Sequence, residues 1–204
     1  MSTGIVDCGT CNLDSVFRAV QECGGTPTVL TTPAELPRMS RVILPGVGNF
    51  RHGMGQLRQR GFGEALREQI VDKEIPLLGI CLGMQYLCTR SWESGETAGL
   101  DLVHGEVKRF QPDDPAVRVP HIGWNEVRFT GPCPLFEGIP DGSDFYFVHS
   151  YHFTDCAPGD TAARTDYAGG FVSAVSHGRV FGVQFHPEKS QKLGFKLLQN
   201  FLSM

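Results

Sequence analysis

The sequence lacks two features that would point to nucleic acids or membranes. It has no run of lysine and arginine, and its acidic residues outnumber the basic ones, 22 to 18. Nucleic acid-binding domains concentrate positive charge, so this balance argues against DNA or RNA as a partner. The longest uncharged apolar stretch, residues 75–87, contains a proline and two glycines and is too short to span about 30 Å of hydrocarbon. Because residues 1–7 leave no room for an export signal, we expect a cytoplasmic protein.

The cysteines lack the spacing of a disulfide framework. There are seven of them, an odd number, in a chain large enough to fold without covalent staples. A second Cys-x-x-Cys motif is also missing, which excludes a four-cysteine zinc site. We therefore expect reduced thiols.

One Cys-x-x-Cys motif does occur, at residues 8–11, between a predicted strand and a predicted helix. A thioredoxin-like dithiol has this placement, so a redox protein is an alternative hypothesis. A mixed metal site with His149 and His152 is another, although it requires distant segments to meet. We favour reduced thiols at Cys8 and Cys11 beside the first helix, and we expect neither a metal nor a cofactor.

The chain also lacks internal repeats, low-complexity segments and an evident linker, so we expect a single domain over residues 1–204. In the first ninety residues, short apolar runs alternate with segments of helical periodicity, which indicates a parallel sheet with helices on both faces. Asn12 and Asn49 are the expected N-caps of the first two helices. The expected strands are residues 4–7, 28–30, 41–44 and 77–80, and the expected helices run from 13 to before Gly24 and over 50–60, 62–71 and 82–89.

The second half of the chain is expected to be mostly strands, because short β-like runs are separated there by proline, glycine and aspartate. The expected fold class is therefore α/β, with three layers: a mostly parallel central sheet, helices on both faces, and a β-rich, partly antiparallel C-terminal half. The Pro-rich residues 111–120 should form a surface loop. The β-like runs are residues 103–110, 125–129, 145–148, 152–154, 171–175 and 180–185, and a last helix is expected at 191–201.

Cys81 lies between two glycines in residues 79–83, Gly-Ile-Cys-Leu-Gly, where a buried strand should turn sharply into a helix. This is the sulfur counterpart of the Gly-x-Ser-x-Gly nucleophile elbow. The glycines leave room for a strained turn, and the N–H groups and positive end of the helix favour a thiolate. From these residues alone, a small buried hydrophobe is an equally good interpretation of Cys81.

A thiol nucleophile needs a base, and His186 is the best placed of the seven histidines. It follows the expected strand 180–185, and one residue separates it from Glu188. In an extended segment, residues i and i+2 point to the same side, so the Glu188 carboxylate can orient the imidazole. A lone histidine at a strand end is more often an ordinary surface residue, but the glutamate partner and the separate cysteine motif favour catalysis.

An acyl-transfer site also needs fixed N–H donors for an oxyanion. Residues 45–48, Pro-Gly-Val-Gly, follow the third expected strand, so in a parallel sheet they should lie at the same edge as Cys81. An ordinary connecting loop is the alternative. A phosphate loop is disfavoured because neither Gly-Lys-Ser/Thr nor Gly-x-Gly-x-x-Gly occurs here.

Together these motifs resemble those of the triad (class I) glutamine amidotransferases. The similarity rests on residues 79–85 and on residues 182–188, Gly-Val-Gln-Phe-His-Pro-Glu, with residues 45–48 upstream, in that family's order. Within the family, residues 120–125, Pro-His-Ile-Gly-Trp-Asn, together with 146–151 and 188–190, are similar to glutaminase subunits of imidazole glycerol phosphate synthase. The glutaminases of anthranilate and aminodeoxychorismate synthases share the Cys and His motifs and are the alternative.

The resemblance implies a role for each matching residue. Cys81 would attack the side-chain carboxamide of glutamine, His186 would protonate the leaving ammonia, and Glu188 would orient His186. Backbone N–H groups of Val47 and Leu82 would hold the oxyanion. The residues that match the glutamine-binding positions are Gly48, Gln85, Glu93, Ser150 and Tyr151.

The resemblance also implies a partner. A separate TIM-barrel cyclase subunit would form a heterodimer with the glutaminase and add the ammonia to a ribulosyl aminoimidazole carboxamide nucleotide in histidine biosynthesis. Family members commonly begin Asp-Tyr-Gly-x-Gly-Asn, whereas residues 7–12 here read Asp-Cys-Gly-Thr-Cys-Asn. We expect this departure to change only how the first loop packs, and we expect the cyclase to contact the Asn12 loop and the Lys189 region.

Overall fold

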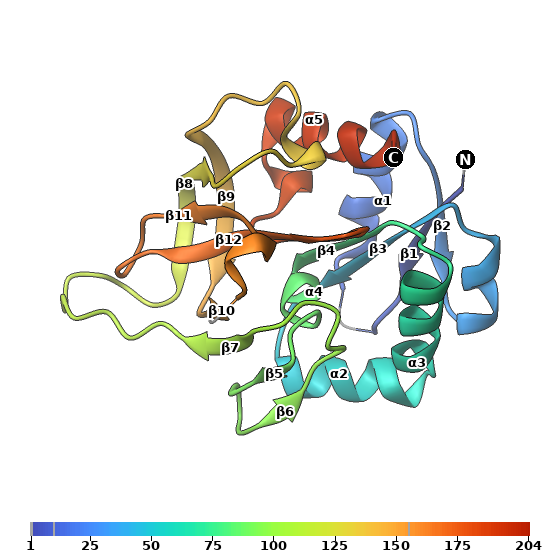
Figure 1. The fold of residues 1–204 in the computed structure, drawn as a ribbon, viewed down its shortest axis with the longest axis horizontal. Helices are drawn as coiled ribbons and strands as arrows, with labels where there is room; N and C mark the ends of the chain where they lie inside the picture. The colour runs from blue at the N-terminus through green and yellow to red at the C-terminus, as the bar shows by residue number, and fades with distance from the viewer. Residues whose placement is uncertain (1, 10, 155) are drawn as a thin grey trace.

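The computed structural model describes residues 2–9, 11–154 and 156–204. Five parallel strands form its central sheet in the order β2-β1-β3-β4-β13. Figure 1 labels the first four of them. The last of the five comes from the C-terminal half of the chain and pairs with β4, so the carboxyl ends of these two strands lie side by side. The strands are β1 (Ser2–Val6), β2 (Thr26–Leu30), β3 (Arg41–Gly46), β4 (Leu77–Cys81) and β13 (Val180–Val183).

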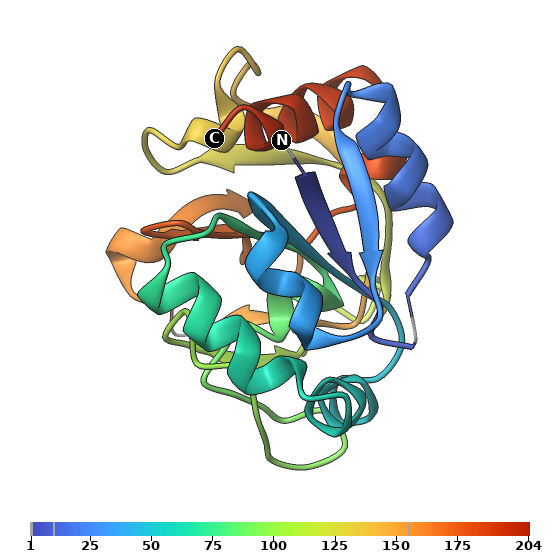
Figure 2. The same ribbon diagram turned by 90° about the vertical axis from the view of Figure 1, so that its right-hand side faces the viewer.

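Helices cover both faces of this sheet, as Figure 2 shows. Successive strand residues point to opposite faces, and both faces are apolar: Ile5 and Ile43 belong to one buried cluster, and Val6 and Leu44 to the other. The continuous apolar runs therefore give a strand buried on both sides, and the expected three-layer arrangement is confirmed. One face packs against α1 (Leu13–Glu22) and α5 (Gln191–Leu202), and the other against α2 (Phe50–Gln59) and α3 (Phe62–Arg67).

The C-terminal half extends the sheet with antiparallel strands, as expected. Strand β12 pairs antiparallel with β13 and with β10, and β10 pairs antiparallel with β7. A hairpin of β8 and β9 is attached through β11. These strands are β7 (Glu106–Arg109), β8 (His121–Phe129), β9 (Ser143–His149), β10 (Tyr151–Thr154), β11 (Thr161–Thr165) and β12 (Phe171–His177), and β5 (Arg90–Ser91) and β6 (Thr97–Ala98) complete the edge.

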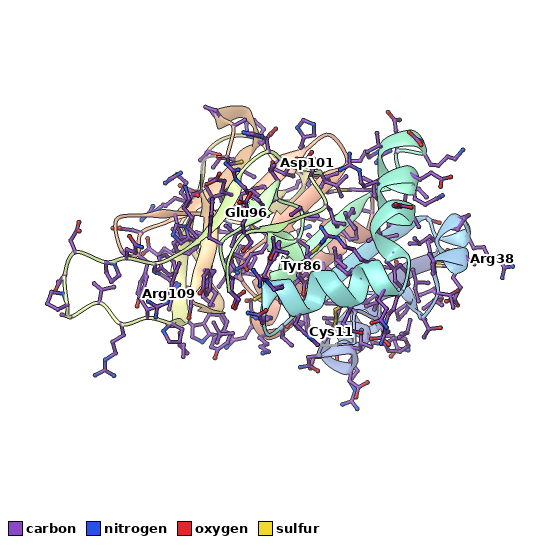
Figure 3. All side chains as sticks on the ribbon, turned by 90° about the horizontal axis from the view of Figure 1, so that it is seen from below. Cys11, Arg38, Tyr86, Glu96, Asp101 and Arg109 are labelled. Atoms are coloured by element: carbon purple, nitrogen blue, oxygen red, sulfur yellow. A yellow bond between two sulfur atoms is a disulfide. The ribbon has the colours of Figure 1, made fainter. Side chains whose placement is uncertain are left out.

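The helix expected over residues 82–89 is much shorter, and α4 spans only Leu82–Gln85. The backbone carbonyls of the residues that follow α4 do not accept the helical hydrogen bond from the N–H four residues later. Instead, the carbonyl of Tyr86 accepts from the N–H of Leu100 at 2.7 Å, and that of Leu87 accepts from the N–H of Leu102 at 2.9 Å. The returning segment thus ends the helix, and the Tyr86 side chain lies against α2 (Figure 3), where its ring is 5.5 Å from that of Phe50.

Two smaller expectations about helices also change. Asn49 caps α2, since its side chain accepts from the N–H of His52 at 3.1 Å, but the Asn12 side chain makes no such bond to α1. The helix expected over 62–71 is α3 followed by one π-helical turn, Glu68–Asp72. Residues 111–120 form a loop without strand or helix, as expected.

Cys8 and Cys11 form a disulfide, so the expectation of reduced thiols at these positions is wrong for this structure. Gly9, with φ +75° and its N–H bonded to Asp7 Oδ1 at 2.8 Å, turns the chain so that the two Cα atoms lie 6.2 Å apart. The intervening Thr10 lies outside the described residues. Within the described ranges, no three or more His, Cys, Asp or Glu residues cluster in a way that could hold a metal ion.

None of the helices in the described part of the chain is long and apolar enough to cross a membrane.

Candidate active site

Cys81 lies at the tip of a tight strand-to-helix turn. It ends β4 and has a left-handed φ of +55°, a strained conformation for a residue other than glycine. The turn depends on its flanking glycines. A Cβ on Gly83 would lie 1.7 Å from the carbonyl oxygen of Leu44, and one on Gly79 would lie 2.7 Å from that of Gly83. Only glycine lets α4 fold back this closely, so the spacing of the motif builds the elbow.

The helix behind Cys81 is shorter than expected, since α4 is a single turn of four residues. What the turn does provide is first-turn N–H groups, beginning with that of Leu82, which have no partner inside a helix.

His186 and Glu188 form a buried pair beside the elbow. The imidazole Nδ1 lies 2.8 Å from Glu188 Oε1, and the two side chains are 3% and 2% exposed. Glu188 reaches the ring from a 3-10 turn, Pro187–Lys189, and not from an extended segment as we expected. The backbone N–H of His186 is itself fixed on the Tyr146 carbonyl at 2.9 Å.

The charge state of His186 follows from its two neighbours. Burial lowers its pKa, but the Cys81 thiolate and the Glu188 carboxylate outweigh that effect and raise the pKa to about 10. The imidazole of His186 is therefore protonated at neutral pH in the fold. Glu188 holds its Nδ1 side, while the buried Nε2 has no hydrogen-bond partner among the described residues and is free for a reacting group.

A cavity of about 370 Å³ opens over this pair. It contains every residue that the sequence suggested for the site except Glu188, which lies behind His186. Four further lining residues were not proposed as site residues, although all of them fall in the motif segments 120–125, 146–151 and 188–190. The lining residues are Val47, Gly48, Cys81, Leu82, Gln85, Glu93, Pro120, Val148, His149, Ser150, Tyr151, His186 and Lys189.

The polar walls of the cavity are held in place by hydrogen bonds. Glu93 Oε2 accepts from the N–H of Phe50 at 2.8 Å, at the start of α2. The carbonyl of Ser150 accepts from the N–H of Phe110 at 3.0 Å. The carbonyl of Tyr151 accepts from Gln85 Nε2 at 2.9 Å. The expected substrate-binding groups are therefore ordered before any ligand arrives.

Two buried histidines form a hydrogen-bonded chain that ends on the backbone carbonyl of Tyr151. Its carbonyl also lies 2.9 Å from His149 Nδ1, and because a carbonyl only accepts, this nitrogen must carry the proton. His149 Nε2 then accepts from His121 Nδ1 at 3.1 Å, and Asn125 Nδ2 donates to His121 Nε2 at 3.3 Å. Both rings are neutral in this arrangement. Burial lowers the pKa of His121 to about 4 and that of His149 to about 3.

These histidines should make the fold sensitive to acid. In the unfolded chain a histidine binds a proton near pH 6.5, whereas His121 and His149 stay neutral in the fold down to about pH 4, so stability falls as the pH drops between these values. By pH 5 each should cost on the order of 2 kcal/mol. Urea midpoints at pH 7.5 and 5.0 should differ less in His121→Gln/His149→Gln than in the parent. The exposed control His52→Gln should behave like the parent, and an equally steep loss in the double variant would contradict the assignment.

Comparisons with known proteins agree with this geometry. The family model described as glutamine amidotransferase class-I matches residues 4–204. The chain is 48% identical over 197 residues to imidazole glycerol phosphate synthase subunit HisH of Moorella thermoacetica, covering 97% of this chain and 92% of that protein. It is 44% identical to the HisH subunit of Yersinia pseudotuberculosis over the whole of both chains.

Solved structures show the same fold at lower identity. A crystal structure of a glutamine amidotransferase superposes with a TM-score of 0.75 at 19% identity, covering 98% of this chain and 97% of that one. The crystal structure of a protein from Thermoplasma acidophilum, described as part of a putative GMP synthase, gives 0.73 at 21% identity, covering 100% and 92%. At this identity the likeness concerns the fold alone.

Proposed function

The chain belongs to the class I glutamine amidotransferases, and we propose that it is the glutaminase subunit of an imidazole glycerol phosphate synthase. In this role it hydrolyses L-glutamine and passes the ammonia to a cyclase subunit, which makes imidazole glycerol phosphate and aminoimidazole carboxamide ribonucleotide in histidine biosynthesis. The observation that carries the proposal is the identity of 41–48% with HisH subunits over nearly the whole chain. Residues 1–204 form one amidotransferase domain in this proposal.

The first half of the reaction releases ammonia. The Cys81 thiolate attacks the side-chain carbonyl carbon of glutamine, and the electron pair of the C=O bond moves to oxygen. Backbone N–H groups of Val47 and Leu82 hold this oxyanion. His186 gives its Nε2 proton to the nitrogen, and the oxyanion re-forms the C=O bond as the C–N bond breaks. Ammonia departs, and a glutamyl thioester remains on Cys81.

The second half regenerates the enzyme. Water attacks the thioester, and the now neutral His186 takes the proton of that water. The C–S bond breaks with the thiolate of Cys81 as the leaving group, and glutamate departs from the cavity. Glu188 holds Nδ1–H throughout, which keeps Nε2 directed at the reacting atoms and stabilises the imidazolium each time it forms.

The polar walls of the cavity suit the amino-acid end of glutamine. The Glu93 carboxylate is available to an ammonium group, and the Gln85 side chain and the Gly48, Ser150 and Tyr151 backbone offer hydrogen bonds. A cavity of about 370 Å³ has ample room for one amino acid. These residues would hold glutamine with its carboxamide directed at Cys81.

The cyclase should dock over the mouth of this cavity, because exposed apolar side chains gather there. Ile122 and Trp124 of β8 are 60% and 45% exposed, and Val148 of the paired strand β9 is 36% exposed. Val47 adds a further 38% exposed side chain at the cavity. A partner protein covering this patch would remove apolar surface from water and would receive ammonia before water protonates it.

The test of this function is partner-specific glutamate release. The purified chain is mixed with a cyclase and its nucleotide substrate, or with the synthase component of anthranilate or aminodeoxychorismate synthase. We expect glutamine-dependent formation of the imidazole product with the cyclase and no stimulation by the other components. Stimulation by an anthranilate or aminodeoxychorismate component instead would assign the chain to that branch of the family.

His186 and Glu188 should act as one unit, so their losses should not multiply. His186→Ala removes the acid and base. Adding Glu188→Ala then has little further effect, because no imidazole remains for the carboxylate to orient. The double variant should therefore release glutamate only slightly more slowly than His186→Ala alone. Steady-state rates of the three variants with the cyclase present provide the measurement. If the two single effects multiply, Glu188 acts independently of His186.

A further inference from the structure

Gln184 lies next to the nucleophile and has no role in the mechanism described above. It follows β13 directly, and the parallel register that pairs Val183 with Ile80 places it beside Cys81. Its side chain is completely buried, and its Nε2 lies 3.7 Å from Cys81 Sγ, within hydrogen-bonding distance for sulfur. A polar carboxamide thus faces the reacting atom from within the core.

The orientation of this carboxamide is fixed by a second glutamine. Gln85 Nε2 donates to Gln184 Oε1 at 3.0 Å and also to the carbonyl of Tyr151 at 2.9 Å. Turning Gln184 over would bring its NH₂ group against that of Gln85 and its oxygen against the sulfur of Cys81. The first contact sets two donors against each other in a buried site, and the second is unfavourable for a thiolate, so the amide donor is held toward Cys81.

We propose that Gln184 is a further residue of the catalytic centre, donating an N–H hydrogen bond to the Cys81 thiolate. The proposal rests on the role of Cys81 in the proposed function. An amide does not titrate, so this donor remains when His186 has given its proton to ammonia. In the second half of the reaction the negative charge returns to sulfur as the C–S bond breaks, and a donor already in place lowers the cost of that step.

A structural role makes a different prediction. If Gln184 only supports Gln85, its Oε1 acceptor is the part that matters. Gln184→Glu keeps the shape and this acceptor but replaces the NH₂ donor with an oxygen. A carboxylate at this place would also repel a thiolate directly. The neutral variant Gln184→Met therefore decides between the roles: a merely structural role leaves the pKa of Cys81 unchanged, and donation to the thiolate predicts that it rises. Gln184→Met provides a neutral side chain of similar length without a donor.

The pH profile of Cys81 alkylation separates these roles. The purified chain is treated with iodoacetamide from pH 5 to 10, and the peptide that contains Cys81 is quantified by mass spectrometry. We expect the midpoint to move upward by about one pH unit in Gln184→Met, which loses the donor to the charged form, and further in Gln184→Glu, which also places a negative charge near the sulfur. With the cyclase present, glutamate release should fall about tenfold in Gln184→Met.

A matched control comes from Gln69, which is also buried but lies in the π-helical turn Glu68–Asp72. Gln69→Glu should leave the alkylation midpoint unchanged. If Gln184→Glu fails to fold, Gln184→Met decides the question. A midpoint equal to the parent's in the folded Gln184 variants would overturn the proposal. Alkylation needs no glutamine, so a shifted midpoint in a chain that releases no glutamate would contradict the proposed function and leave the donor role of Gln184 standing.

Discussion

Cys81→Ala should abolish glutamine hydrolysis while the cyclase, supplied with ammonium salts, continues to form its product. The variant removes the sulfur that forms the thioester, and without that covalent intermediate no step of the mechanism can proceed. Single loss of a nucleophile of this type has cost about 10⁶-fold in a related mechanism. Glutamate release and ammonia-dependent product formation, measured on the same preparation, check the two halves of the prediction.

No other cysteine can take over the reaction. Burial raises the pKa of Cys23 to about 11, and it also raises the pKa of Cys88, Cys133 and Cys156, so these thiols stay protonated at neutral pH. Cys11 is held in the disulfide with Cys8. Near-normal glutamate release from Cys81→Ala would therefore remove the thioester from the mechanism.

Cys11→Ser is the matched control for this experiment. The Sγ atoms of Cys8 and Cys11 lie 3.3 and 3.4 Å from the carbonyl oxygen of Pro45, outside the cavity that contains Cys81. Loss of the disulfide removes a cross-link between residues only three apart in sequence. We expect a mild effect on glutamate release, which distinguishes loss of the nucleophile from a general effect of replacing a cysteine.

Local patterns were sufficient to predict the parallel half of the fold. The apolar runs of β1, β3 and β4 and the glycines around Cys81 act over a few residues, so the sequence displays them directly. The end of α4 could not be predicted in this way, because N–H groups about fifteen residues later form hydrogen bonds with the backbone carbonyls that follow the helix. Strand β11, Thr-Ala-Ala-Arg-Thr, has no apolar run and exists because β12 and β8 pair with it.

In the candidate site, too, some residues could be predicted from local patterns and others depend on contacts between distant segments. Cys81, His186 and the Pro-Gly-Val-Gly loop carry short motifs and were found from them. The hydrogen-bonded histidines were not, because they meet through the register of a hairpin that pairs His121 with His149. Gln184 likewise reaches Cys81 through the pairing of β13 with β4. Motifs therefore located the residues that line the candidate site, whereas the groups that support them depend on contacts between distant segments.

The segment at the end of β3 places Val47, the expected oxyanion donor, between a tightly packed glycine and an open one. Gly46 is wedged against the elbow, since a Cβ there would lie 2.8 Å from the backbone nitrogen of Gly83. Gly48 is the opposite case: its φ is +97°, and nothing lies within 4 Å of the position of a Cβ. Val47 between them is 38% exposed at the cavity. Gly46, the last residue of β3, thus fixes the chain on one side of Val47, whereas Gly48 leaves open space on its other side.

We expect the isolated chain to be a slow glutaminase that becomes fast when a cyclase with bound nucleotide docks over the cavity. Losing one oxyanion donor typically costs about 100- to 1000-fold in rate, so turning a single peptide toward Cys81 can account for a large activation. A ligand shifts such an equilibrium only through its different affinity for the two states, and the docked partner has to supply that difference. Glutamate release is measured for the chain alone, with cyclase, and with cyclase plus nucleotide.

Val47→Pro isolates the donor in that experiment, because proline has no N–H. The variant should stay slow in all three conditions, whereas Val47→Ala keeps the N–H and should be activated like the parent. Binding to the cyclase is measured in parallel, since Val47 belongs to the apolar patch where the cyclase is expected to dock. If Val47→Pro binds the cyclase normally and is still activated fully, the Val47 N–H does not hold the oxyanion. Equal rates of the parent in all three conditions would mean that docking does not control this loop.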